Sequence, residues 1–259
     1  MNVQSARVAL RDRTLLDVLD LSLRFVVAHK GAFAKMTACV SLPAFVVSWA
    51  IASRAGWYWG WTAAIALASV AEAPFVALAS RLVFQESVPV RQALGAGLRS
   101  LPALVLLRLL QVLMLGLAAA FFLLPALWIA ALFFFAAEVV VLEGSSVGSS
   151  IGRMQRLGTG YFGDVAMAML AMVLLYALAI LLGDVALGEL LEGILQIRLR
   201  PSEDEVGGPL ALFAMWLAVP VLTTARFFVY LNLRTRREGW DIQTRFAALA
   251  ARAREEAAA

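Results

Sequence analysis

The stretch LPALVLLRLLQVLMLGLAAAFFLLPALWIAALFFFAAEVVV, from Leu101 to Val141, decides the fold of this chain. Its only formal charges are Arg108 and Glu138. As a helix it would extend roughly 60 Å, whereas the hydrocarbon core of a bilayer is about 30 Å thick. The stretch is therefore long enough for two membrane crossings, and Pro125 marks the predicted break between them.

The composition of the whole chain agrees with a membrane location. Hydrophobic residues make up 62% of the 259 residues and charged residues 15%, against about half and about a quarter in soluble domains. One soluble core cannot bury that excess, so we predict an all-α membrane protein. The net charge of +4 comes from basic residues near span ends, which argues against a nucleic-acid partner.

Hydropathy predicts six transmembrane helices, each close to the ~20 residues that a crossing needs. They lie at about 36–53, 57–80, 101–121, 125–142, 163–183 and 210–232. The first is too long for the apolar segment of a signal peptide, so we expect it to remain as an anchor. We predict a single integral membrane domain over 1–259. It comprises an N-terminal interfacial segment (1–30), a six-span bundle (31–233) and a cytoplasmic helical tail (234–259).

The distribution of Lys and Arg predicts the orientation. Sixteen of these residues lie in the N-terminal segment, the second and fourth connectors and the tail, and the opposite side keeps Arg54, Arg198 and Arg200. The larger group belongs in the cytoplasm. We therefore expect a multi-pass protein of the cell inner membrane with both termini cytoplasmic.

Three segments before span pairs carry an apolar stripe at helical spacing, around 15–26, 90–101 and 147–154. Such amphipathic helices are expected to lie in the membrane interface. The chain would then consist of three helix-plus-hairpin units. Since each unit crosses the membrane twice, the units would share one orientation and be related by parallel symmetry.

Two parts of the chain resemble a recurrent bacterial pattern. One runs from Leu123-Leu124-Pro125 through Leu142-Glu143-Gly144 to Tyr161-Phe162, and the other from Pro220 through Tyr230-Leu231-Asn232 to Trp240-Asp241-Ile242. The pattern is similar to the multi-pass proteins related to the membrane domain of glycerophosphoryl diester phosphodiesterases. The resemblance implies a membrane domain without established chemistry, and the family's usual acidic residue after the tyrosine is Asn232 here.

Glu72 is the first candidate functional residue. It lies near the middle of the second predicted span, two residues before Pro74, which removes a helix hydrogen bond and favours a kink. A carboxyl group at this depth must be protonated, paired or facing water. Two interpretations of Glu72 follow. It is either a transport site linked to a proton or a cation, or a structural glutamate that is paired inside the bundle.

Arg108, Glu138 and Arg226 form a second candidate group, each near the cytoplasmic end of its span. One interpretation is an interhelical ion-pair network, with Arg81 or Asp164 as further members. The other is a pocket for anionic lipid headgroups. Together with Glu72, these residues are our candidate transport or lipid site.

Other motifs give weaker signals. Gly158-Thr159-Gly160-Tyr161-Phe162-Gly163 matches GxGxxG but lacks the preceding strand of a dinucleotide site, so a hinge is expected. Gly144, Gly148 and Gly152 are spaced for close helix contact or for a loop. His29 is the sole histidine and Cys39 the sole cysteine, so we expect no metal site, cofactor or catalytic residue.

The sequence thus predicts a non-enzymatic membrane component that acts as a scaffold or subunit of a membrane complex or organises lipid. The alternative is a small transporter or channel with a midplane acidic site. The expected partners are the lipid bilayer, anionic lipid headgroups, and a protein partner or a second copy of the chain.

Overall fold

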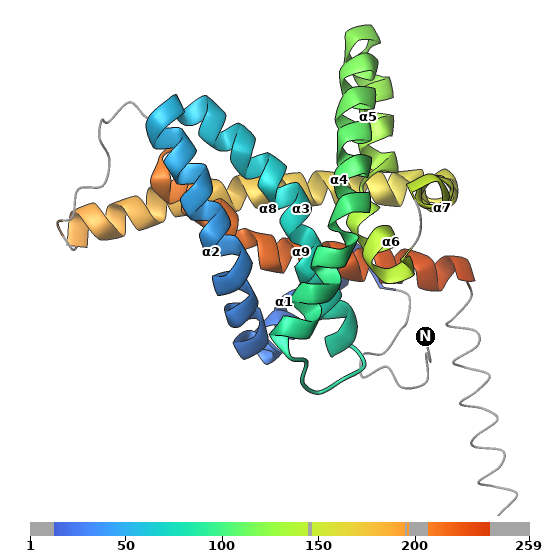
Figure 1. Cartoon of the computed structure of the whole chain (residues 1–259), viewed down its shortest axis with the longest axis horizontal. Coiled ribbons are helices and arrows are strands. Elements are labelled where there is room, and N and C mark those ends of the chain that lie inside the picture. The colour runs from blue at the N-terminus through green and yellow to red at the C-terminus, as the bar shows by residue number, and fades with distance from the viewer. Residues whose placement is uncertain (1–12, 145–146, 195, 197–206, 239–259) are drawn as a thin grey trace, which may run out of the picture.

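A computed structural model of the chain describes residues 13–144, 147–194, 196 and 207–238 (Figure 1). Almost all of them lie in helices. In chain order these are α1 (Leu15–Ala28), α2 (Lys30–Ala55), α3 (Trp57–Leu82), α4 (Val90–Phe121), α5 (Leu123–Leu132), α6 (Ala136–Glu143), α7 (Val147–Gly160), α8 (Phe162–Glu189), the π-helical turn η2 (Leu190–Ile194) and α9 (Pro209–Glu238).

Six helical segments are long and apolar enough to cross a membrane: α2, α3, α4, the α5–α6 segment, α8 and α9. The chain is therefore consistent with a polytopic membrane protein, as the hydropathy predicts. Helices α2 and α3, α4 and α5, and α8 and α9 pack side by side as neighbouring pairs. The parallel symmetry expected among the three units stays a prediction.

Helix α1 begins with a capping box, in which the Thr14 hydroxyl and the Asp17 carboxylate each accept a backbone N–H. Such a box satisfies two N–H groups that a helix start leaves free. The buried side of α1 packs on α9 through Val18, Ser22 and Phe25, and the Phe25 ring meets Phe228 edge-on at 5.1 Å. Leu23 on the same helix is exposed, and the expected place of α1 in the membrane interface stays a prediction.

The second amphipathic segment does not form a separate helix. Residues 90–101 continue into the third span as the single 32-residue helix α4, which contains Pro102. A proline removes one hydrogen bond from the helix, and close packing of the first turns of α4 on α3 keeps the segment helical. A Cβ on Gly97 would lie 2.6 Å from the Pro74 nitrogen, so the two backbones touch there.

The fourth span is broken rather than continuous. Phe122 is extended before α5, and Phe133 and Phe135 form a turn that separates α5 from α6. Pro125 falls in the first turn of α5, where its missing N–H costs nothing. In Figure 1, α4 and α5 run together and project beyond the other helices.

The core is built around α9, which packs against α1, α2, α3 and α8. Its fully buried side chains include Trp216, Phe227 and Tyr230. Two glycines also allow neighbouring helices to approach closely. Gly60 of α3 lies against Ala52 of α2, and Gly183 of α8 lies against Ala214 of α9. Close helix contact was one of two alternatives for Gly144, Gly148 and Gly152, and the described structure does not show it, because a Cβ at each would meet nothing within 4 Å.

Candidate functional site

Glu72 lies buried in the middle of α3 and accepts hydrogen bonds from two arginines. Arg226 of α9 binds both carboxylate oxygens, through Nη1 at 2.6 Å and Nη2 at 2.7 Å. Arg108 of α4 adds a third bond from Nη2 at 2.8 Å. The two-pronged Arg–carboxylate arrangement is the geometry in which such pairs are strongest.

Arg226 also joins Glu72 to the broken fourth span. Its Nε donates to Oε1 of Glu138 at 2.7 Å, and its guanidinium carbon lies 5.8 Å from the centre of the Phe134 ring. Glu138 is in the first turn of α6, where the helix dipole favours a negative charge. Its second oxygen, Oε2, is buried without a hydrogen-bond partner.

Arg108 completes the group with contacts along α3 and α4. Its Nη1 donates to Oε1 of Gln111 at 2.7 Å, and its Nε donates to the carbonyl of Ser69 at 3.3 Å. Arg108 thus binds a carbonyl and a carboxylate of α3 and an amide of its own helix.

The four candidate residues therefore meet in one place. We call Glu72, Arg108, Glu138 and Arg226 the central network. They come from α3, α4, α6 and α9, and their formal charges sum to zero. Asp164 does not belong to the network, because it pairs with Arg236 at 3.1 Å. Arg81 does not belong to it either. A role in transport or lipid binding stays a prediction.

A cavity of about 540 Å³ lies against this network. Glu72, Arg108, Arg226 and Gln111 supply polar atoms on one wall, and α8 supplies an apolar wall that includes Met169, Met172, Val173 and Ile180. The cavity opens at the surface of the bundle, because Ile65 and Val173 on its rim are 64% and 58% exposed. In a membrane this rim would face lipid chains.

Thr223 borders the cavity with a hydroxyl group that is unusual for a helix. The neighbouring Thr224 donates to the carbonyl of Pro220 at 2.7 Å, as helical threonines commonly do. The Thr223 hydroxyl is buried and has no hydrogen-bond partner. A buried polar group without a partner costs about 1–3 kcal/mol, which a ligand oxygen or nitrogen would offset.

A second polar cluster was not predicted from the sequence. Glu143 at the end of α6 pairs with Arg153 of α7, accepts a hydrogen bond from the Tyr230 hydroxyl at 3.1 Å, and lies 3.6 Å from Arg234. The signal available was the resemblance, because Glu143, Arg153 and Tyr230 all fall in the matching stretches. The cluster ties α6 and α7 to the end of α9.

Asn232 has a structural partner at the start of the described chain. Its side-chain amide accepts a hydrogen bond from the Arg13 N–H and donates one to the Arg13 carbonyl, both at 3.1 Å. A carboxylate, the usual residue of the resembling family, could make only the first of these bonds. The asparagine side chain can therefore pair with both the N–H and the carbonyl of Arg13, as it does here.

The remaining sequence candidates lie in structural positions. The His29 ring is 2.9 Å from the Phe25 carbonyl at the α1–α2 junction. The GxGxxG residues span the end of α7 and the start of α8, with one residue between the helices. Cys39 is exposed. The predicted tail beyond Glu238 lies outside the described residues.

Comparison of the chain with protein-family models, with curated proteins and with solved structures gave no match. The resemblance to the membrane domains of glycerophosphoryl diester phosphodiesterases therefore stays a prediction.

Proposed function

We propose that this protein is a non-enzymatic, multi-pass component of the inner membrane that binds and organises lipid. The observation that carries the proposal is the cavity of about 540 Å³ beside the central network. It has an apolar wall, a polar wall and a rim of exposed apolar side chains, which together suit an amphiphilic molecule held from the bilayer.

The charge of the central network supports a ligand whose polar end is neutral or zwitterionic. Two arginines and two glutamates balance each other. Glu138 does not line the cavity, but its pairing with Arg226 leaves the network as a whole with no excess charge to attract an anion. Hydroxyl, ester and amide groups would pair with the Thr223 hydroxyl and with Gln111, which both line the cavity. The acyl chain would lie along α8.

The same contacts support a role without catalysis. Glu72 accepts three hydrogen bonds from two arginines, which stabilise its charged form and oppose its use as a general base. A scaffold or subunit role would use the cavity to fix the protein in a lipid environment of defined composition. The expected protein partner or homo-oligomer stays a prediction.

Extraction in native-lipid nanodiscs, followed by mass spectrometry of the lipids and proteins that co-purify, tests the proposal. Ala177, an exposed cavity-lining residue of α8, is replaced by Trp to fill the cavity, and Ala186, exposed on α8 away from it, receives the same change as control. We expect an enriched lipid with wild type and Ala186→Trp and its loss with Ala177→Trp. Equal lipid content in all three would contradict a cavity ligand.

A small transporter or channel remains the alternative function, because Glu72 and Arg108 border the cavity in the middle of their spans. In that case Glu72→Gln would abolish ion-coupled flux in proteoliposomes while the protein stays folded. Full flux with the variant would remove Glu72 as the coupling residue.

The proposed orientation has its own test. Cysteines introduced at Ser202 and Ala253 in a Cys39→Ala background would be labelled from outside only at position 202. The reverse pattern would invert the topology that the basic residues predict.

A further inference from the structure

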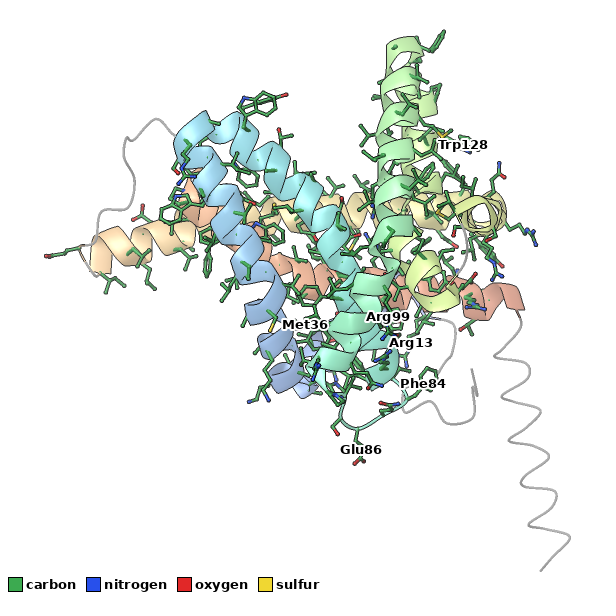
Figure 2. All side chains as sticks on the ribbon, in the orientation of Figure 1. Arg13, Met36, Phe84, Glu86, Arg99 and Trp128 are labelled. Carbon is green, nitrogen blue, oxygen red and sulfur yellow. The ribbon has the colours of Figure 1, made fainter. Side chains whose placement is uncertain are left out.

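A second pocket, of about 430 Å³, lies where α3 gives way to α4. Arg81 from the last turn of α3 lines it, with Pro89, Arg91, Gln92, Gly95 and Arg99 from the start of α4. Figure 2 shows Arg99 on this part of α4, close to the connection that carries Phe84 and Glu86. The central network is separate, and the two sites share no residue.

The arginine pocket, as we call this site, has no internal counter-charge. Its lining holds three guanidinium groups, one amide and no carboxylate. Within the part of the chain that the structure describes, no side-chain hydrogen bond or ion pair engages Arg81, Arg91 or Arg99. The Nη1 of Arg81 is also buried without an acceptor. A buried donor without an acceptor and three like charges around one hollow are both unfavourable.

We propose that the arginine pocket binds a phosphate group. Guanidinium groups bind phosphate in a planar, two-pronged way, and the Gln92 amide can donate a further hydrogen bond. The pocket lies at the end of the α3 span, on the side that carries the excess of Arg and Lys. Phospholipid phosphates occupy that depth on the cytoplasmic face. The phosphate belongs to an anionic lipid headgroup or to a soluble phosphorylated molecule.

Topology alone does not explain this arrangement. The positive-inside rule requires basic residues near span ends, but it requires neither a pocket nor a buried guanidinium nitrogen. Arg24, by contrast, pairs with Asp20 at 2.9 Å within its own helix. Convergence of three arginines from two helices on one hollow is the feature that points to a ligand.

The test compares nanodiscs of phosphatidylcholine with nanodiscs that also contain phosphatidylglycerol, with bound lipid counted by native mass spectrometry. The double variant Arg81→Gln/Arg99→Gln removes two charges from the pocket. Arg24→Gln/Lys35→Gln removes two exposed charges expected on the same side. We expect wild type and the control to prefer phosphatidylglycerol. The pocket variant should lose about 30-fold in affinity, the effect of two basic residues near an anionic lipid.

A second arm titrates inorganic phosphate and glycerol 3-phosphate into the phosphatidylcholine nanodiscs and follows thermal unfolding. If these phosphates stabilise wild type but not the pocket variant, the site binds soluble phosphate. If wild type binds phosphatidylglycerol selectively and the soluble phosphates do not stabilise it, the site binds lipid. The proposal is overturned if neither probe binds, or if both double variants lose binding equally. Ala177→Trp should leave phosphate binding unchanged, which separates this site from the central cavity.

Discussion

The central network and the arginine pocket differ in how their positive charges are balanced. In the network, Arg108 and Arg226 meet two glutamates inside the bundle. In the pocket, Arg81, Arg91 and Arg99 meet no carboxylate among the lining residues. The number of arginines therefore does not define a site. A network whose charges are balanced by its own carboxylates holds helices together, whereas a cluster without carboxylates takes its counter-charge from a ligand.

Arg226→Ala should cause the largest loss of stability. It leaves Glu138 without the arginine that it pairs with and Glu72 with Arg108 alone. Removing one member of a buried ion pair costs about 3–5 kcal/mol. Thermal unfolding in detergent would measure the change, with Arg24→Ala as the exposed control. A shift no larger than that of the control would show that the network does not hold the bundle together.

Glu72→Gln and Glu138→Gln should differ in how much they destabilise the protein. Glu72 accepts three hydrogen bonds in the network and Glu138 accepts one. Charge-assisted hydrogen bonds contribute about 1.5–3 kcal/mol each, so Glu72→Gln should destabilise the protein more than Glu138→Gln. Both variants leave the same net charge, which makes them matched. Equal losses in chemical denaturation would mean that charge balance outweighs bond geometry.

Gly97→Ala should disturb both sites at once, because Gly97 of α4 is two residues from Arg99 and lies against Pro74, which is two residues from Glu72. The added methyl would lie 2.6 Å from the Pro74 nitrogen, and overpacking of this kind costs about 1–3 kcal/mol. Gly116→Ala on the same helix meets nothing within 4 Å and should be neutral or stabilising by up to about 1 kcal/mol. Similar melting temperatures for the two variants would place the close contact in doubt.

Arg99→Gln should have the smallest effect on the ligand-free protein. Arg99 is exposed and lines a pocket of like charges, so we expect a change within about 0.5 kcal/mol in phosphate-free detergent. Thermal unfolding with and without phosphatidylglycerol would then separate stability from binding. A large loss without lipid would mean that Arg99 has a structural partner and that the contrast between the two sites is false.

The spans were predictable because length and apolarity alone decide them. Each of the six predicted crossings overlaps a helical segment that could span a membrane. The break at Phe133–Phe135 was not predictable, because those residues include neither proline nor glycine and their turn depends on the helices around them. The fusion of 90–101 with the third span depends likewise on the contact of Gly97 with Pro74.

The central network was predictable in its members but not in its pairing. Charged residues in spans must find partners, which singled out Glu72, Arg108, Glu138 and Arg226. Glu72 and Arg226 are 154 positions apart, and no local pattern specifies such a contact. The position of Arg81 was not predictable for a related reason. The sequence indicated it as a further member of the ion-pair network, and the lack of a partner for its Nη1 exists only in three dimensions.

The central position of α9 has a consequence for how the protein is made. Ribosomes add about 5–20 residues per second, so Arg226 emerges about 8–30 seconds after Glu72, from which it is separated by 154 positions. Glu138 precedes Arg226 by 88 positions, so for about 4–18 seconds at that rate the newly inserted helices hold Glu138 without its arginine. Biosynthesis therefore passes through a half-built bundle that carries an uncompensated carboxyl group, and the arrival of the last described helix is the event that locks the earlier ones in place.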